Sequence, residues 1–201
     1  MKLWAVVPVK AFSSAKSRLE PSLEGAQRQA FAQGLFEHVS GELLRHAAIE
    51  RLLVVTNSEQ VQAHATALGA TAIKDPADSK VLGQIVDAAL RHAEQQGATH
   101  GLVLMGDLPR LSQVSLSRLI AALALHPQVI VSDRHQVATN ALGLKLPCPA
   151  PTAFGSGDSL RLHLARFPAA RWLRDPELEL DVDEPNDLDA LSAHAAAEHR
   201  R

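Results

Sequence analysis

Residues 101–109 of the chain read Gly-Leu-Val-Leu-Met-Gly-Asp-Leu-Pro, an apolar run that ends in a glycine, an aspartate and a proline. Short apolar runs bounded by turn residues are typical of buried strands. We therefore predict a strand over 101–105, followed by a turn that begins at Gly106. In α/β proteins ligands bind beyond the carboxyl ends of such strands, so Asp107 is a candidate functional residue.

Outward from this strand, short apolar runs alternate with longer stretches of helical periodicity. This β-α-β-α order predicts a single α/β domain over 1–201, with a mostly parallel sheet flanked by helices on both faces. The predicted strands are 3–9, 51–56, 70–73, 101–105, 128–132, 141–145 and 178–182, and the predicted helices are 24–47, 59–68, 81–96, 112–125, 159–166 and 185–198.

Composition excludes several classes of protein. With 201 residues, 46% of them apolar, the chain is long enough to bury one large core and is not disordered. Twenty basic and 22 acidic residues give a net charge of -2, and aromatic residues are few, so nucleic acid is not an expected partner. No apolar run is long enough for a signal peptide or a membrane span, and Cys148 is the single cysteine. We expect a cytoplasmic protein that does not bind membranes.

The loop after the first predicted strand carries three cations, Lys10, Lys16 and Arg18, within nine residues. Serines 13 and 14 and the backbone N–H groups of the loop add hydrogen-bond donors between them. Such a loop could hold a polyphosphate. The alternative is a basic surface loop that is only solvated.

Acidic residues at two places in the chain are candidate metal ligands. Asp107 follows the strand at 101–105. Asp181 and Asp183 lie at the end of the predicted strand 178–182, and in a strand they would fall on the same face because side chains alternate. Three converging carboxylates suit Mg²⁺, which proteins bind through carboxylates together with substrate phosphates. The alternatives are a turn aspartate at 107 and a helix-starting aspartate at 183.

The segment Gly155-Ser156-Gly157-Asp158-Ser159 is a donor-rich turn before a predicted helix. It is not a dinucleotide-binding fingerprint, because Leu160 stands where the third glycine should be. The N-terminus of the helix would suit a carboxylate or a phosphate, although an ordinary capped glycine loop explains the turn equally well. The ten histidines are scattered and are expected to be solvated, and only His135, in a polar loop, is a candidate for function.

Seven strings of residues, in this order, resemble the 2-phospho-L-lactate guanylyltransferase family of coenzyme F420 biosynthesis. The resemblance covers nearly the whole chain. It implies a nucleotidyltransferase fold of the glycosyltransferase-A-like kind and a reaction of GTP with 2-phospho-L-lactate, phosphoenolpyruvate or 3-phospho-D-glycerate. The strings are Val7-Pro8-Val9-Lys10, Ala15-Lys16-Ser17-Arg18-Leu19, Gly106-Asp107-Leu108-Pro109, Ser132-Asp133-Arg134-His135, Thr139-Asn140-Ala141-Leu142, Ala153-Phe154-Gly155-Ser156-Gly157 and Leu180-Asp181-Val182-Asp183-Glu184-Pro185.

The resemblance also implies a role for each site residue. Mg²⁺ would be bound by Asp107, Asp181 and Asp183, and the acid would be bound by Thr139 with Gly155, Gly157 and Ser159. Lys10, Lys16 and Arg18 would contact the nucleotide phosphates, with Lys16, Arg18 and Asp107 as catalytic residues.

Base recognition is where the chain departs from the family pattern. Ile85-Val86-Asp87 stands where the family usually has Gly-Leu-Asn, so Asp87 would have to accept hydrogen bonds from guanine.

The expected reaction is in-line attack by a phosphate oxygen of the acid on the α-phosphorus of GTP, with release of pyrophosphate. Positioning and electrostatic stabilisation would supply the rate acceleration, and an ionised phosphate needs no general base. The alternatives are another nucleotidyltransferase or sugar transferase on the same fold, and a nucleotide-sensing regulator without turnover. The sequence leaves a homodimer open.

Overall fold

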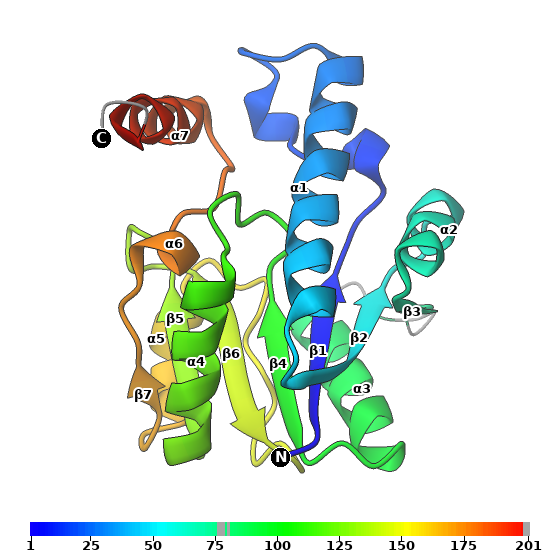
Figure 1. Cartoon of the computed structure of the whole chain (residues 1–201), viewed down its shortest axis with the longest axis vertical. Coiled ribbons are helices and arrows are strands. Elements are labelled where there is room, and N and C mark those ends of the chain that lie inside the picture. The colour runs from blue at the N-terminus through cyan, green and yellow to red at the C-terminus, as the bar shows by residue number, and fades with distance from the viewer. Residues whose placement is uncertain (76–78, 80, 199–201) are drawn as a thin grey trace.

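The computed structural model, which describes residues 1–75, 79 and 81–198, contains one seven-stranded sheet in the order β3-β2-β1-β4-β6-β5-β7 (Figure 1). β1, β2, β3 and β4 pair in parallel, β6 is antiparallel to both β4 and β5, and β7 pairs in parallel with β5. The sheet is therefore mostly parallel, as predicted. Its strands are β1 (Leu3–Pro8), β2 (Ile49–Val55), β3 (Thr71–Ile73), β4 (His100–Leu104), β5 (Gln128–Ser132), β6 (Thr139–Lys145) and β7 (Arg171–Trp172).

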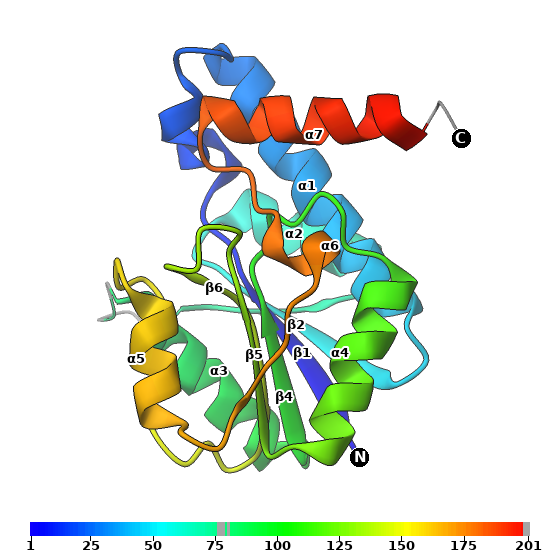
Figure 2. The same ribbon diagram turned by 90° about the vertical axis from the view of Figure 1, so that its left-hand side faces the viewer.

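Helices cover both faces of the sheet, as Figures 1 and 2 show from two sides. One core contains Leu3, Ala5 and Val7 of β1 and packs under α1 and α4, and the other contains Trp4 and Val6 and packs under α3 and α5. Alternate residues of β1 thus enter opposite cores, as the pleat of a strand requires. The helices are α1 (Gly25–Arg45), α2 (Glu59–Leu68), α3 (Leu82–Gln95), α4 (Gln113–Leu125), α5 (Ser159–Arg166), α6 (Pro176–Glu179) and α7 (Pro185–Glu198), with short 3₁₀ helices at Phe12–Ser14 and Ser17–Leu19.

One predicted strand is wrong. Residues 178–182 form no strand: α6 occupies Pro176–Glu179, and the residues after it are irregular. Asp175 starts this helix by accepting a hydrogen bond from the N–H of Glu177, and Pro176 suits its first turn. The alternation still predicts burial correctly, because Leu178, Leu180 and Val182 all point into the protein.

Strand β7 was not predicted, because two residues are too few to show a periodic pattern.

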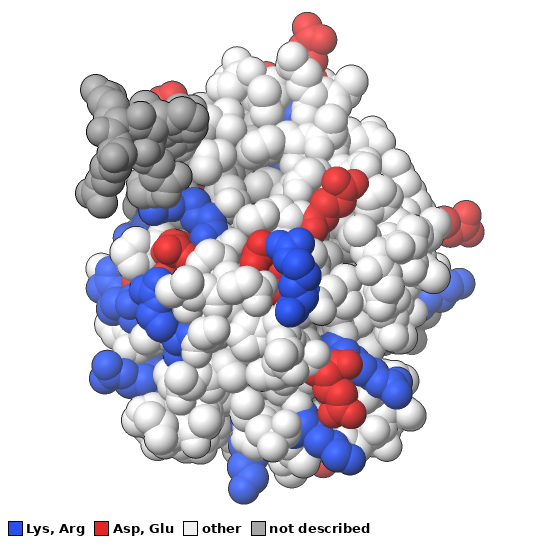
Figure 3. Space-filling view, in the orientation of Figure 1, with Lys and Arg blue, Asp and Glu red and all other residues white. Residues whose placement is uncertain are grey.

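The surface carries side chains of both charge signs, in line with the net charge of -2. Most of the face drawn in Figure 3 is uncharged, and basic side chains lie beside acidic ones at several places on it. Among the described residues, no helix is both long and apolar enough to span a bilayer.

Candidate active site

The candidate residues gather at one edge of the sheet because of the strand directions. β1 and β4 are parallel neighbours, so the segments that follow Pro8 and Leu104 leave the sheet on the same side (Figure 1). β6 runs against β4 and therefore begins at this edge, where the N–H of Met105 donates to the carbonyl of Asn140 at 2.9 Å. Three segments far apart in the sequence thus meet here.

Lys16 connects two of the predicted metal ligands. Its Nζ lies 2.5 Å from Oδ2 of Asp107 and 3.0 Å from Oδ1 of Asp183, and its side chain is only 7% exposed. The backbone of Lys16 is left-handed, with φ of 56°, which turns the chain sharply between the two 3₁₀ helices. This turn aims the side chain at the carboxylates.

The charges at this cluster are not balanced. Burial disfavours the ammonium of Lys16, yet the charges and hydrogen bonds of Asp107 and Asp183 outweigh it and raise the pKa of Lys16 above its usual value. Burial, followed by the charges of Asp107 and Asp183, raises the pKa of Asp181 to about 6. Lys16 pairs with Asp107 and Asp183, and no ion pair to Asp181 occurs among the described residues.

This donor set is compatible with a cation such as Mg²⁺. Oδ1 of Asp107 is buried and has no hydrogen-bond partner among the described residues, and Asp181, whose pKa is raised by burial and then by the charges of Asp107 and Asp183, lies close to them. Hard oxygen ligands of this kind suit Mg²⁺. In the described part of the chain, no three His, Cys, Asp or Glu side chains are grouped so that they could hold a metal ion, so magnesium binding stays a prediction.

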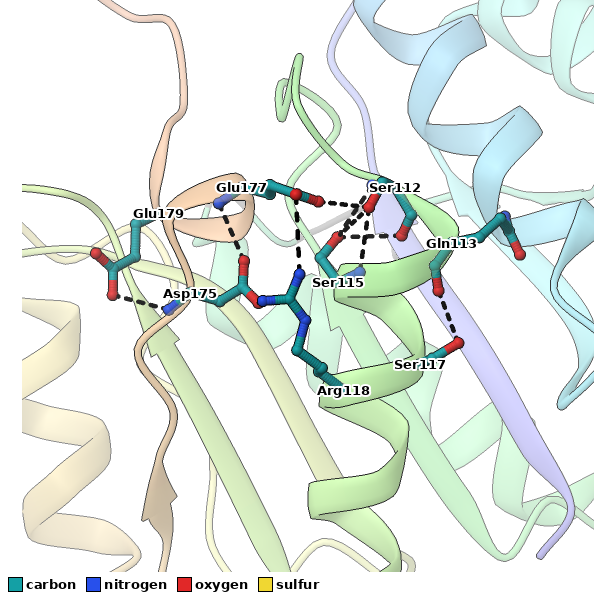
Figure 4. Close-up of polar contacts among 8 residues, drawn as sticks. All are labelled: Ser112, Gln113, Ser115, Ser117, Arg118, Asp175, Glu177 and Glu179. Atoms are coloured by element: carbon teal, nitrogen blue, oxygen red, sulfur yellow. Dashed lines mark hydrogen bonds and ion pairs between the residues drawn. The ribbon is translucent and has the colours of Figure 1, made fainter. Parts of the chain in front are cut away.

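Helix α6 anchors the segment that carries Asp181 and Asp183 to the body of the protein (Figure 4). Asp175 is 1% exposed, and its Oδ2 lies 3.0 Å from Nη1 of Arg118 on α4. Glu177 accepts a hydrogen bond from the hydroxyl of Ser112, which caps the same helix. α6 is thereby fixed against the N-terminal half of α4.

Two polar side chains hold the backbone around the acidic residues. Nδ2 of Asn140 donates to the carbonyls of Leu178 and Glu179 at 3.1 and 3.2 Å. Oδ2 of Asp187 accepts from the N–H groups of Asp183 and Glu184 at 2.8 and 2.7 Å. The segment that carries the acidic residues is therefore held in place although the predicted strand does not form.

A hollow of about 370 Å³ lies beside the cluster's sheet edge, where β1, β2 and β3 end. Asp75 lines it, and burial raises the pKa of this carboxyl group. Oδ1 of Asp75 is buried without a hydrogen-bond partner among the described residues. The remaining lining residues are Val9, Lys10, Ala11, Ser14, Thr56, Asn57 and Ser58.

The three cations of the first loop do not lie together. Lys10 lines the hollow, Lys16 lies between the carboxylates, and Arg18 is exposed on the second 3₁₀ helix. Their shared role in phosphate binding, inferred from their spacing and from the family resemblance, remains a prediction.

The glycine turn packs directly on the start of α3. Gly155 has φ of 82°, and a Cβ at this position would lie 2.9 Å from Cβ of Leu82. The N–H of Gly83 donates to the carbonyl of Phe154 at 2.9 Å, and a Cβ on Gly83 would come within 2.8 Å of the carbonyl oxygen of Thr152. The turn therefore depends on glycine at both 83 and 155.

Thr139 and Ser159 lie side by side, as a shared site requires, but both are buried. Oγ of Ser159 accepts from the N–H of Thr139 at 2.9 Å, and Oγ1 of Thr139 lies 2.8 Å from Nδ1 of His163. Each hydroxyl oxygen already has one partner inside the protein, so only its own proton remains to meet a substrate, and the expected contact with the acid stays a prediction.

Two further residues differ from their expected surroundings. Oδ1 of Asp87 accepts from the N–H of Thr152 at 2.9 Å, and Asp87 does not line the hollow that contains Asp75. His163 is completely buried beside the glycine turn, whereas it was expected to be solvated with the other histidines. Its place in the apolar stretch at 159–166, next to the glycine turn, was the signal that sequence reasoning passed over.

Comparison with known proteins agrees with this geometry. The model of the MobA-like NTP transferase domain matches residues 30–174. A phosphoenolpyruvate guanylyltransferase of Conexibacter woesei is 35% identical over 100% of this chain and 94% of its own length. A 3-phospho-D-glycerate guanylyltransferase of Colwellia psychrerythraea is 30% identical over 96% of this chain and 92% of its own. The chain belongs to this guanylyltransferase family.

Solved structures show the same fold at lower identity. A putative nucleotide-diphospho-sugar transferase from Desulfovibrio desulfuricans matches with a TM-score of 0.79 at 15% identity, over 95% of this chain and 87% of the other. A 4-diphosphocytidyl-2C-methyl-D-erythritol synthase matches with a TM-score of 0.64 at 18% identity, over 95% and 97%. The predicted nucleotidyltransferase fold is confirmed.

Proposed function

We propose that this enzyme transfers GMP from GTP to the phosphate of a small phospho-carboxylic acid and releases pyrophosphate. The observation that carries the proposal is the cluster of Lys16 with Asp107 and Asp183 at the carboxyl edge of β1 and β4. A buried ammonium beside two carboxylates, with Asp181 as a third acidic residue nearby, supplies the charges that phosphates and a divalent cation would need. Relatives named as phosphoenolpyruvate and 3-phospho-D-glycerate guanylyltransferases support this choice of acceptor.

The residues of this chain would act by positioning and by charge. Lys16 and Lys10 would neutralise the triphosphate, and the turn at 155–159 would hold the acid so that its phosphate oxygen attacks the α-phosphorus in line. Asp107, Asp181 and Asp183 would hold Mg²⁺, which would supply positive charge to the phosphate oxygens. No general base is required, because the attacking phosphate is already ionised.

We also propose that the hollow at the ends of β1, β2 and β3 binds the guanine base, and that Asp75 recognises it by hydrogen bonds. Guanine presents two adjacent N–H donors, and a carboxylate can accept both. Oδ1 of Asp75 is buried and finds no hydrogen-bond partner in the part of the chain that the structure describes, so it would gain most from such a ligand. Asp87 is less suited to this role, because its Oδ1 holds Thr152.

The proposed reaction belongs to coenzyme F420 biosynthesis, in line with the sequence resemblance. The acid itself is left open among 2-phospho-L-lactate, phosphoenolpyruvate and 3-phospho-D-glycerate, since relatives that act on different acids are similarly distant from this chain.

A screen of nucleoside triphosphates tests the proposal. Each triphosphate is incubated with Mg²⁺ and each acid, and pyrophosphate release is measured for the wild type, Asp107→Asn and Asp75→Asn. We expect release with GTP, loss of turnover by orders of magnitude in Asp107→Asn, and a KM for GTP about ten-fold higher or more in Asp75→Asn. Release with a different nucleotide would favour another nucleotidyltransferase, and no release with any would favour a nucleotide-binding regulator.

A further inference from the structure

His163 on α5 lies in an aromatic cage beside the glycine turn. It is 0% exposed, with the ring of Phe154 edge-on at 4.8 Å and the ring of Phe167 stacked at 6.1 Å between centroids. Burial, and secondarily the charge of Arg166, lowers the pKa of His163 to about 4. The imidazole is therefore neutral near pH 7, and one of its two ring nitrogens carries the single proton.

The hydrogen bonds of His163 decide which nitrogen that is. The backbone N–H of Ala153 can only donate, and it lies 2.8 Å from Nε2 of His163. Nε2 is therefore the acceptor, so Nδ1 carries the proton and donates it to Oγ1 of Thr139 at 2.8 Å. A chain of donors thus runs from Ala153 through His163 to Thr139.

This direction leaves the hydroxyl protons of the site free to donate. Because Oγ1 of Thr139 accepts from His163, its own proton must be directed elsewhere, and no acceptor for it occurs among the residues that the structure describes. Oγ of Ser159 likewise accepts from the N–H of Thr139. Both hydroxyls are thus set as donors, the polarity that an anionic substrate needs.

We infer that His163 is a positioning residue for the phospho-acid, acting through Thr139 by fixing that hydroxyl as a donor. This inference rests on the proposed function, because an anionic acid at the turn is what the donors would meet. It gives the buried histidine a role that packing alone would not require, since a phenylalanine could fill the cage without forming either hydrogen bond.

Two substitutions separate the two hydrogen bonds of the imidazole. In His163→Gln the amide falls near the position of Nε2, so it can still accept from Ala153, but the donor to Thr139 is lost. In His163→Asn the amide falls near Nδ1, so the donor to Thr139 is kept while Ala153 loses its acceptor and the cage is left underfilled.

We expect His163→Gln to impair use of the acid more than His163→Asn does, and His163→Asn to be the less stable of the two. We expect His163→Gln to raise the KM for the acid about ten-fold or more, with the KM for GTP and the free energy of unfolding little changed. His163→Asn should keep the KM for the acid within about three-fold of wild type although it unfolds more readily. His92→Gln, near the C-terminal end of α3, is the matched control and should match the wild type in every measurement.

A double-mutant cycle with Thr139→Val tests whether His163 acts through Thr139. The double variant His163→Gln/Thr139→Val should have the same acid KM as Thr139→Val alone, because the hydroxyl that His163 orients is already absent. The inference would be overturned if the two substitutions raised the acid KM independently, so that their effects multiplied. It would also be overturned if the acid KM rose more in His163→Asn than in His163→Gln, following the loss of stability. If the wild type joins GMP to none of the acids, the proposed function fails and this inference fails with it. A wild type that turns over while the variants follow the wrong order overturns this inference alone.

Discussion

Lys16 and Arg18 are two residues apart, but only Lys16 is buried against the carboxylates. Lys16→Ala would leave Asp107 and Asp183 without their ammonium, so we expect kcat to fall by about ten- to a hundred-fold. Arg18→Ala removes an exposed positive charge that would help to hold bound GTP. It should therefore raise the KM for GTP and leave kcat within about three-fold. Steady-state kinetics with GTP varied at saturating acid distinguishes the two. Equal effects on kcat would contradict the separation seen in the structure.

His163 makes stability depend on pH in a defined direction. Its pKa falls from 6.5 to about 4 on folding, so the unfolded chain binds more protons between these values and stability rises with pH across that window. Above pH 6.5, His163 contributes about 3 kcal/mol to the free energy of unfolding, and this contribution is lost as the pH falls towards 4. Urea denaturation at pH 4.5 and 7.5 should show a larger loss at low pH for the wild type than for His163→Gln. Identical losses would mean that His163 is not buried as a neutral ring.

The sequence predicted the residue types of the site better than their contacts. Asp107, Asp183 and Lys16 could be proposed because carboxylates and cations follow strand ends. The left-handed turn at Lys16 that brings them together has no sequence signal, since lysine rarely adopts it. The tautomer of His163 was equally hidden, because it depends on the N–H of Ala153, ten residues earlier.

At the scale of elements, the turn between β6 and α5 depends on one of its two glycines. Gly155 combines a positive φ with a close approach to Leu82, whereas a Cβ on Gly157 would meet nothing within 4 Å. Gly155→Ala should therefore lower the free energy of unfolding by about 1–3 kcal/mol, and Gly157→Ala, the matched control, by less than about 0.5 kcal/mol. Chemical denaturation of both variants measures the difference. Similar losses in the two would show that the turn does not rely on the conformation of Gly155.

Element prediction succeeded where periodicity was long and failed where polar capping decided the outcome. α2, α5 and α7 begin and end where the sequence indicated, and so does β5. The alternation at 178–182 is genuine, and it does place apolar side chains in the core. It could not show that Asp175 and Pro176 start a helix, or that no neighbouring strand is available to pair with this segment.

At the scale of the whole molecule, the proposed base, phosphate and acid sites lie along one edge of the sheet, as expected for ligands of open α/β folds. GTP with Mg²⁺ should therefore bind the folded protein alone and stabilise it. At about 100 times its Kd the gain is about 2.7 kcal/mol, which corresponds to a Tm higher by several degrees. Thermal denaturation with GTP and with ATP checks this. An equal rise in Tm with GTP and with ATP would show that the protein does not select guanine.

In the proposed reaction, a new phosphoanhydride joins GMP to the phosphate of the acid. The wild type is incubated with GTP, Mg²⁺ and each of the three acids in turn, and the product is analysed by mass spectrometry and ³¹P NMR. We predict, with at least one acid, a product whose mass equals acid plus GMP less one water, with two coupled phosphorus resonances and one equivalent of pyrophosphate. Pyrophosphate accompanied only by free GMP, or no consumption of GTP with any of the acids, would contradict the account.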